Sequence, residues 1–293
     1  VQKLTENPEL EREAEEINRK LEAKEDANLN ELWGKTRKLS LDSFEKIYEE
    51  LNTKFDVWFF ESEMEEKGKK IVDKLFNKRI AHLSEGALIV NLEEYGLGVW
   101  VLLRKDGTIL YSAKDLELAE AKFKKFKIDK SIYVVGSQQR LHFMQLFKTL
   151  ELMKFKAKEK LIYVPVSEVR FPWGKMSSRT GENVLYSEFK EELMKHAKNE
   201  IMEREKIGKN ELEKRALAIV IAAMKYSMLK QDTDKSIIFV KEEAMKFEGN
   251  TGPYLLYTYA RAKSILRKSK LKKLVLPKIK EVSQKEKNLI FKL

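Results

Sequence analysis

The stretch "SIYVVGSQQRLHFMQLFKTLELMKFKAKEKLIYVPV", residues 131–166, decides the fold class. Two short apolar runs, SIYVVG and LIYVPV, flank a segment from Gln139 to Met153 in which apolar residues recur at helical spacing. A strand, a helix and a second strand in this order predict a βαβ unit with parallel strands. The sequence therefore indicates an α/β fold.

Further elements are expected on both sides of this unit. Before it we expect four helices: a charged one over 6–26, one from Ser40 to Leu51 capped by Ser40, one from Lys67 to Leu83 and one from Leu116 to Phe126. Strands are expected at FDVWFF (55–60), ALIVNL, VWVLLR and DGTILYS. After it only helices are expected: Tyr186 to Lys206, Asn210 to Lys230, and one with Pro253 in its first turn, capped by Thr251 or Gly252 and ending near Lys268. The change from mixed to helical segments predicts a domain boundary near residues 185–210.

Composition narrows the class of protein. The chain has 293 residues, enough for two domains, and 43% of them are hydrophobic, enough to form cores. There is no cysteine and only three histidines, which excludes a disulfide framework and argues against a metal site in the protein. No apolar run is long enough to cross a membrane, and the N-terminus does not resemble a signal peptide. We expect a cytoplasmic protein without a membrane partner.

Charge is distributed unevenly along the chain. Residues 1–66 contain 10 Lys and Arg against 19 Asp and Glu, a balance of −9, whereas the remainder contains 48 against 28, a balance of +20. A basic body suggests a polyanionic partner such as nucleic acid. A lysine-rich proteome, in which Lys and Glu solvate helix faces, explains the charge equally well.

Two segments of the α/β part carry polar groups that could bind a ligand. Gly136 and Gln139 lie where a predicted strand ends and a helix begins, the edge at which parallel sheets bind ligands, and His142 and Gln145 share a face of that helix. Tyr111 and Asp115, four residues apart, could hold a cationic ligand. Taken alone, each segment is better explained as structural: helix capping and packing in the first, an N-cap acid and a core tyrosine in the second.

Two further segments could contact phosphates or RNA. GKMSSRTG contains cations and hydroxyls suited to phosphate, although its glycine spacing differs from a Walker loop and a surface turn explains it as well. The segment FEGNTGPYLLYTYARAKSILRK interleaves tyrosines with cations, so it could stack on bases and neutralise phosphates. An amphipathic helix with its apolar side in a core is the alternative, and the set assigned to that core is Leu255, Tyr259, Ala262 and Leu266.

In this order, these segments resemble one family, the arginyl-tRNA synthetases, which are class I aminoacyl-tRNA synthetases, with the likeness strongest to archaeal and eukaryotic members. The similar stretches are ELW, FDVWFFES, DGTILYSAKD, YVVGSQQRLHF, GKMSSRTG and FEGNTGPYLLYTYARAKSILRK, which together extend over almost the whole chain. The last of them is highly specific, and six similar stretches in register outweigh the structural explanation of each one alone.

The resemblance implies a reaction and a set of site residues. Arginine and ATP would form arginyl-adenylate, and the arginyl group would pass to the 3′ end of tRNA(Arg); Mg²⁺ is expected with ATP, with no dedicated protein ligand for the metal. The implied roles are arginine binding for Tyr111, Asp115 and Gln139; ATP binding for Gly136, His142, Gln145 and Met176; catalysis by the mobile loop for Lys175, Ser177, Ser178 and Arg179; and tRNA binding for Tyr254, Tyr257, Arg261, Lys263 and Arg267.

The resemblance also implies a domain order. It predicts a helical insertion over 1–55, the second half of a Rossmann-like nucleotide-binding domain over 56–185, and the start of an all-α anticodon-binding bundle, incomplete, over 186–293. The chain would thus be truncated at both ends and would need a complementing N-terminal synthetase segment.

The chain departs from the family pattern in three places. Ser178 occupies the loop position where class I enzymes ideally have lysine, Lys114 replaces a common arginine before Asp115, and no His-Ile-Gly-His signature occurs. We therefore expect the chain alone to be inactive. Two other functions remain open: a non-catalytic tRNA-binding protein on a synthetase scaffold, and a class I synthetase for another amino acid, which Asp115 disfavours.

Overall fold

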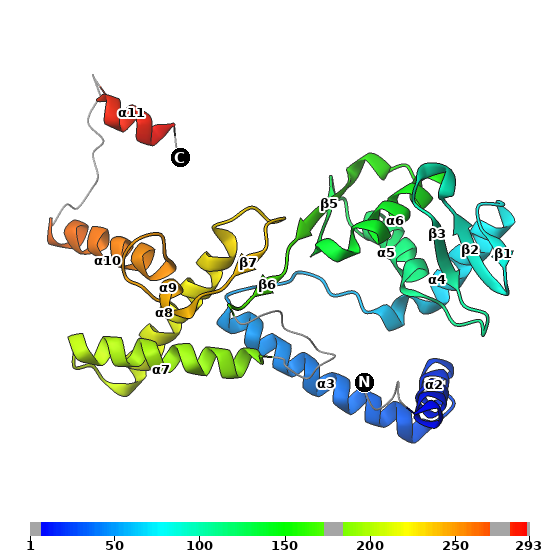
Figure 1. The fold of residues 1–293 in the computed structure, drawn as a ribbon, viewed down its shortest axis with the longest axis horizontal. Helices are drawn as coiled ribbons and strands as arrows, with labels where there is room; N and C mark the ends of the chain where they lie inside the picture. Colours follow the sequence, from blue (N-terminus) through cyan, green and yellow to red (C-terminus); the bar gives the residue numbers. More distant parts are fainter. Residues whose placement is uncertain (1–6, 173–183, 270–281, 292–293) are drawn as a thin grey trace.

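The elements of the chain follow one another from helices to a mixed α/β part and back to helices (Figure 1). The computed structural model describes residues 7–172, 184–269 and 282–291. The fold is mixed α/β, mostly helical, with small sheets.

The predicted βαβ unit is confirmed. Strand β4 (Ser131–Gly136) pairs in parallel with β5 (Leu161–Val166), and helix α6 (Arg140–Leu152) connects them. The register is regular, with Ser131 opposite Leu161 and Gly136 opposite Val166. Short 3-10 turns, Ser137–Gln139 and Lys158–Lys160, join the helix to the strands.

An antiparallel sheet precedes this unit. It consists of β1 (His82–Ser84), β2 (Ala87–Asn91) and β3 (Val99–Leu103), in that order, with the 3-10 turn Glu93–Tyr95 between the last two strands. Helices α4 (Glu61–Asn77) and α5 (Tyr111–Lys125) pack against each other beside it.

Two boundaries predicted for this region are wrong. The helix expected over Lys67–Leu83 ends at Asn77, and Leu83 belongs to β1, because the chain turns at Arg79 with a φ of 58°. The strand expected at DGTILYS is reduced to a single bridge between Ile109 and Leu103, since α5 already begins at Tyr111.

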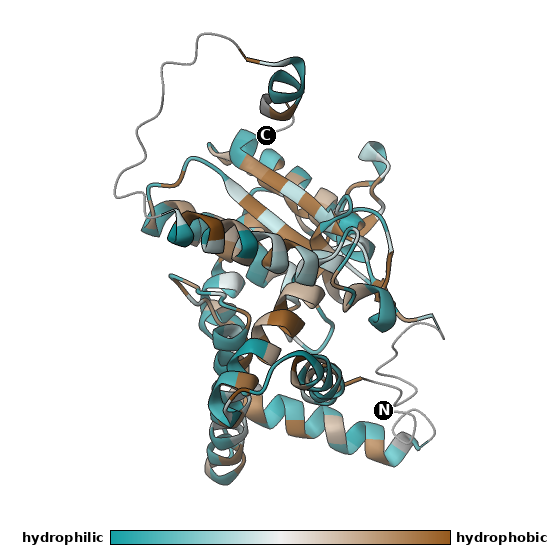
Figure 2. Cartoon of the chain, turned by 90° about the vertical axis from the view of Figure 1, so that its left-hand side faces the viewer, coloured by the Kyte–Doolittle hydropathy of each residue, from teal (hydrophilic) through white to brown (hydrophobic). Residues whose placement is uncertain are grey.

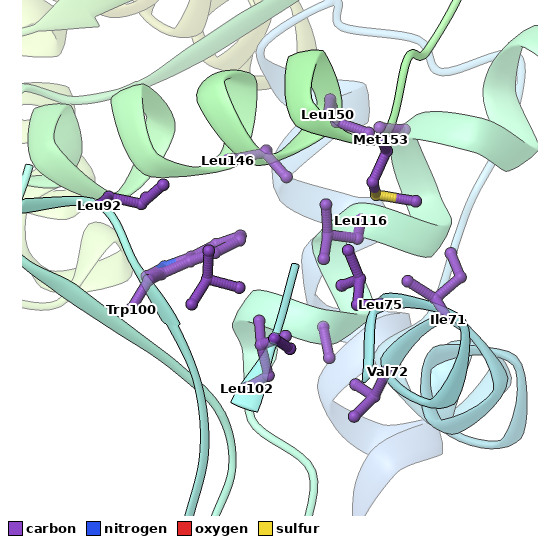
Figure 3. Packing of buried hydrophobic residues seen from close by; sticks show 14 of the residues in the cluster. Ile71, Val72, Leu75, Leu92, Trp100, Leu102, Leu116, Leu146, Leu150 and Met153 are labelled. Carbon is purple, nitrogen blue, oxygen red and sulfur yellow. The ribbon is translucent and has the colours of Figure 1, made fainter. Parts of the chain in front are cut away.

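One hydrophobic core unites the α/β part. Figure 3 shows Trp100 and Leu102 of β3 pointing into it, with Leu146 and Leu150 of α6 on the opposite side. Trp100 and Leu102 lie two residues apart on a strand, so both side chains reach the same face. This core holds β3, α5 and α6 in fixed positions, and these are the elements that carry the predicted arginine site.

A second core lies in the C-terminal part. Helices α7 (Tyr186–Arg204) and α8 (Lys209–Leu229) pack against each other and on Phe171, Phe239 and the short helix α9 (Lys241–Ala244). Strands β6 (Val169–Arg170) and β7 (Ile237–Ile238) form a small parallel pair beside them. The helix expected over Asn210–Lys230 is confirmed, and α8 buries Ala216, Val220 and Ala223 in this core.

The N-terminal helices differ from their prediction. Helix α2 (Pro8–Ala23) is capped by Asn7, and α3 (Ala27–Glu50) by Asp26, whose carboxylate accepts from the backbone N–H of Leu29 at 3.0 Å. Ser40 was therefore the wrong N-cap. Ser40 lies inside α3, because this helix begins 14 residues earlier, where the Asp26 side chain accepts a hydrogen bond from the otherwise unpaired backbone N–H of Leu29.

The strand predicted at FDVWFF is also wrong. Residues 55–60 form no strand in the described chain, and their aromatic rings pack together instead. The rings of Tyr48 and Phe55 lie 4.8 Å apart, and those of Phe55 and Trp58 lie 5.1 Å apart. The apolar residues that suggested a buried strand thus form an aromatic cluster against α3.

The last helices leave much apolar surface uncovered. Helix α10 (Gly252–Lys268) touches α8 through Gly252 and Pro253 but exposes Leu255, Tyr259 and Leu266, and α11 (Gln284–Ile290) exposes Leu289. The alternative prediction for this helix, a core formed by Leu255, Tyr259, Ala262 and Leu266, is therefore wrong within the part of the chain that the structure describes. Hydrophobic residues, brown in Figure 2, accordingly occur on the outside of the molecule as well as between its elements.

Candidate functional site

The candidate arginine site is formed where β3, α5 and α6 meet. Asp115 of α5 and His142 of α6 join their side chains by a hydrogen bond of 2.7 Å between Oδ2 and Nε2. The Tyr111 ring, one turn before Asp115 on α5, lies 4.8 Å from the His142 ring between centroids. The structure therefore brings together three residues that the sequence proposed for two neighbouring ligands.

The first turn of α5 is fixed by its contact with the sheet. Ser112 donates a hydrogen bond to the backbone carbonyl of Val101 in β3, and its side chain is almost fully buried. On the same helix Lys114 forms ion pairs with Glu61 at 3.6 Å and Glu65 at 3.8 Å in α4. Lys114 therefore joins α5 to α4, whereas Asp115 points toward α6.

Asp115 is the accessible acid of this group. Its side chain is 30% exposed, compared with 9% for the side chain of His142. Among the described residues, only Oδ2 of the carboxylate has a hydrogen-bond partner, so Oδ1 remains open to a ligand. Tyr111 is 55% exposed and forms the solvent side of the same site. A planar cation could be held here by the carboxylate beside the phenol ring.

Sequence reasoning missed one residue of this group, Trp100. Its indole Nε1–H donates to His142 Nδ1 at 3.3 Å, and the two rings lie 5.6 Å apart between centroids. The alternation of VWVLL could have indicated that Trp100 points inward, but the contact spans 42 residues of sequence. No local pattern predicts such a pairing.

Gln145 has a structural position. Its side-chain amide donates to the carbonyl oxygens of Leu97 at 2.8 Å and Val99 at 3.4 Å, and the residue is buried. Gln145 and His142 share one face of α6, as expected, and both face the sheet. Gln145 thereby fixes the start of β3, and its role toward ATP stays a prediction.

Gly136 and Gln139 lie at the predicted edge of the parallel strand pair. The Gly136 carbonyl, at the end of β4, accepts a hydrogen bond from the Tyr163 hydroxyl at 3.1 Å. Gln139 occupies the N-cap position of α6 and is exposed. Its side chain is therefore accessible to a ligand, whereas His142, one turn further along α6, is buried.

Two side chains near Asp115 have shifted pKa values. Burial lowers the pKa of Lys122 to about 8, although the charge of Asp115 opposes the shift. Burial also raises the pKa of Tyr133 to about 12, and Asp115 contributes in the same direction. The Lys122 Nζ lies 3.8 Å from the centre of the Tyr133 ring, a cation–π contact that links α5 to β4.

The residues predicted to bind RNA lie on α10, which is exposed over most of its length. The rings of Tyr254 and Tyr257 stack at 6.4 Å, and Arg261 donates to the Tyr257 hydroxyl at 2.8 Å. Lys263 lies over the Tyr259 ring at 5.5 Å. Thr251 caps the helix, accepting from the Tyr254 N–H at 3.2 Å. Tyr257 with Arg261 and Tyr259 with Lys263 thus form two exposed aromatic–cation pairs, and because residues 257 and 259 lie about 200° apart around the helix, the pairs lie on different sides of α10.

The remaining predicted residues include the catalytic loop. Lys175, Met176, Ser177, Ser178 and Arg179 lie outside the described residues. Arg267, predicted to bind tRNA, is exposed near the end of α10. Within the ranges that the structure describes, no three or more His, Cys, Asp or Glu side chains are close enough to hold a metal ion.

None of the described helices is both long enough and apolar enough to span a bilayer.

Comparisons with known proteins agree with these observations. Residues 1–240 match the family model described as tRNA synthetases class I (R), catalytic domain. The arginine–tRNA ligase of Clostridium perfringens is 38% identical over 281 residues, covering 96% of this chain and 49% of that protein. The corresponding ligase of Bdellovibrio bacteriovorus is 38% identical over 240 residues, covering 81% and 41%. The chain thus spans about half the length of the curated relatives it matches.

Solved structures show the same likeness. The arginyl-tRNA synthetase of Thermus thermophilus superposes with a TM-score of 0.75 at 25% identity, covering 98% of this chain and 54% of that one. That of Plasmodium falciparum superposes with a TM-score of 0.74, covering 90% and 45%, and at 22% identity it shows the fold alone. The curated relatives named above are bacterial, so the expected likeness to archaeal and eukaryotic members stays a prediction.

Proposed function

The chain belongs to the class I arginyl-tRNA synthetase family, and on that premise we propose that it binds arginine, ATP and tRNA(Arg) as part of an arginine–tRNA ligase. The reaction would join the arginine carboxylate to the α-phosphate of ATP, releasing pyrophosphate. The arginyl group would then pass to a hydroxyl at the 3′ end of the tRNA. Such a ligase would work in the cytoplasm.

The observation that carries this proposal is the open carboxylate of Asp115. One oxygen accepts a hydrogen bond from His142, the other has no hydrogen-bond partner among the described residues, and the Asp115 side chain is 30% exposed. A guanidinium can donate to that oxygen while lying against the phenol ring, an arrangement that lysine's ammonium cannot match in shape. Gln139, exposed at the start of α6, would bind the backbone of the amino acid.

The ATP side of the site is a proposal from family membership. We propose that Gly136 and Met176 contact the nucleotide, and that Lys175, Ser177, Ser178 and Arg179 stabilise the triphosphate as charge develops on it. His142 and Gln145 were proposed for the same site, but their side chains are buried and bonded to protein groups. Their contribution would be to hold Asp115 and β3 beside the nucleotide. Mg²⁺ would bind together with the phosphates of ATP, and we propose no protein ligand for the metal.

The domain order is proposed on the same basis. Residues 1–55 would be a helical insertion, 56–185 the second half of the Rossmann-like domain, and 186–293 the beginning of the anticodon-binding bundle. The two separate hydrophobic cores support a division into two parts, with Phe171 already belonging to the second core. We propose that Tyr254, Tyr257, Arg261, Lys263 and Arg267 of α10 contact tRNA.

Arginine binding tests the central claim. Calorimetry should show binding of arginine, weaker binding of lysine, and little binding of citrulline, which keeps the shape of arginine but lacks its charge. Asp115→Asn should weaken arginine binding at least about tenfold, because it removes the charge from a charge-assisted hydrogen bond. Asp129→Asn, an equivalent change in an exposed bend before β4, is the matched control. Equal affinity for arginine and citrulline would contradict the proposal.

Activity of the isolated chain is a separate claim. The sequence contains no His-Ile-Gly-His motif, so we propose that the chain needs a complementing synthetase segment to activate arginine. Pyrophosphate exchange should be absent with the chain, tRNA, arginine and ATP alone. Robust arginine-dependent exchange under these conditions would contradict the claim.

A second candidate function is supported by α10. Its exposed tyrosines and cations would suit a tRNA-binding protein that carries out no chemistry. A tRNA titration with and without arginine and ATP separates the two candidates. Coupling between tRNA and the small substrates supports the ligase, and tRNA affinity that is unaffected by them supports the binding protein.

A further inference from the structure

The hydrogen bonds around His142 determine which of its nitrogens carries the proton. The indole N–H of Trp100 can only donate, so Nδ1 of His142 must be the acceptor in their bond of 3.3 Å. The proton of the neutral ring therefore lies on Nε2, from which it is donated to Asp115 Oδ2 at 2.7 Å. The order of donors is Trp100, then His142, then Asp115.

This order opposes a second proton on the ring. A doubly protonated His142 would place an N–H on Nδ1 directly against the N–H of Trp100, two donors facing each other. It would also form a full ion pair with Asp115 and neutralise the charge of that carboxylate. His142 and Trp100 are both buried, and Trp100 belongs to the hydrophobic core of the α/β part.

We propose that Trp100 is a positioning residue for arginine recognition: its N–H keeps His142 neutral and in the Nε2–H form, so that Asp115 is oriented yet keeps its full negative charge for the ligand. This inference rests on the proposed arginine site, because it assigns how the acid of that site is prepared. The hydrogen bond to Oδ2 fixes the orientation of the carboxylate. Because the imidazole is neutral, the negative charge of Asp115 is not neutralised by it and remains available to a cationic ligand.

The other charged and titratable groups near these side chains do not replace this role. Tyr111 of α5 contributes its ring to His142, and Tyr133 of β4 and Lys122 of α5 interact with Asp115 electrostatically. Lys122 lies over the Tyr133 ring at 3.8 Å, and among the described residues no ion pair joins it to Asp115. Trp100 is therefore the group that acts directly on Nδ1.

Nitrogen NMR of the histidine rings tests the proposal on the full chain. Imidazole ¹⁵N shifts distinguish the two neutral forms from the doubly protonated ring, and the chain has only three histidines. His82 and His196 are exposed, so His82→Gln and His196→Gln identify the remaining signal. We expect His142 to be in the Nε2–H form at neutral pH. A doubly protonated ring or the Nδ1–H form at neutral pH would overturn the proposal.

Removal of the indole N–H tests the role of Trp100 itself. Trp100→Phe removes the donor together with part of the ring, and replacement by benzothienylalanine removes the donor but keeps the bicyclic shape. In both variants we expect the imidazole ¹⁵N shifts of His142 at neutral pH to move away from those of the Nε2–H form. Arginine binding, measured by calorimetry at the same pH, should become about tenfold weaker than in the wild type, because the carboxylate is then less well oriented or is neutralised by the imidazolium.

The outcomes separate this proposal from the proposed function. If benzothienylalanine leaves the protonation form of the His142 ring unchanged, Trp100 does not act as inferred, whatever the result for Trp100→Phe. If the NMR result is as expected but the wild-type chain does not bind arginine, the proposed arginine site fails, and with it the use of the prepared carboxylate for that ligand. If the ring form and the arginine affinity change together in the shape-conserving variant, the proposal is supported.

Discussion

Gly252, the first residue of α10, lies so close to Ala222 of α8 that a Cβ at position 252 would overlap the Ala222 carbonyl oxygen. The same Cβ would approach the backbone nitrogen of Ala223 to 2.9 Å. Both atoms belong to the backbone of a packed helix and cannot rotate away. The close approach of α10 to α8 thus depends on a residue without a side chain.

Gly252→Ala should therefore separate the two helices. We expect a loss of about 1 to 3 kcal/mol in the free energy of unfolding, the usual range for overpacking a close contact, measured by urea denaturation. Gly34→Ala is the control: it lies inside α3 with no atom within 4 Å of the added Cβ, and it should stabilise α3 by up to about 1 kcal/mol. Equal effects of the two changes would contradict the argument.

Glu50, the last residue of α3, joins the N-terminal helices to α7. Its carboxylate accepts hydrogen bonds from Lys190 at 2.6 Å and from the Tyr186 hydroxyl at 2.8 Å. Burial raises the pKa of Glu50, but the hydrogen bonds and the charge of Lys190 outweigh it, so the pKa is lowered overall. Because the folded pKa lies below the unfolded one, this contact stabilises the protein above the ordinary glutamate range and loses that effect as the pH falls through the folded pKa.

Glu50→Gln should accordingly destabilise the chain at neutral pH by about 1 to 2 kcal/mol, since it removes a charged partner from a half-buried contact. The difference from wild type should shrink as the pH falls below the ordinary glutamate pKa, because the wild-type carboxyl is then protonated too. Urea denaturation at a series of pH values measures this. A difference that is independent of pH would show that packing, and not the charge, holds α3 to α7.

Lys122 should give stability a pH dependence of the same sign as Glu50, but in the alkaline range. Its pKa is lowered by burial to about 8, so between that pH and the ordinary lysine range the unfolded chain binds a proton that the folded chain does not. Stability should therefore rise with pH in this window. Tyr133, with its pKa raised by burial to about 12, acts in the reverse direction, and its contribution is lost as the pH rises from about 10 toward 12.

Lys122→Met isolates the lysine. At pH 7 the variant should be more stable than wild type by about 1 kcal/mol, because the gain from removing a cation from a poorly solvated site exceeds the loss of its contact with the Tyr133 ring. The difference should narrow as the pH rises toward 10. Lys124→Met is the control: the hydrogen bond to Glu120 raises the pKa of Lys124, so the variant should show no such narrowing. A constant advantage for Lys122→Met would contradict the assignment.

The sequence predicted those parts of the fold that depend on local patterns. The strands β4 and β5 and the helix between them follow from the change of apolar spacing, and Thr251 and Pro253 indicate the start of α10. The prediction failed where two possible helix starts occur in one segment. The apolar spacing from Leu41 onward suggested that the helix begins at Ser40, although Asp26 caps the same helix 14 residues earlier.

The site was predictable in part for the same reason. Tyr111 and Asp115 share a helix face, so their spacing predicted that they would act together, and the structure shows both beside His142. The contact of Trp100 with His142 is a tertiary contact that depends on how β3 packs against α6. The two residues are 42 positions apart, so no periodicity in the sequence predicts the contact. Residues that act on a ligand through another side chain are for this reason the ones that sequence reasoning misses.

The last prediction concerns tRNA binding by α10. Arg261 is exposed, held near Tyr257 by its hydrogen bond of 2.8 Å, and free to place its charge against a phosphate. Arg261→Ala should weaken tRNA binding and reduce by about 1 the slope of log affinity against log salt, because one fewer counterion is released. Filter binding at several salt concentrations measures both. Lys35→Ala on the acidic α3, where Lys35 pairs with Glu31, is the control and should leave the slope unchanged. If both variants lower the slope equally, the effect reflects net charge, and α10 is not the tRNA surface.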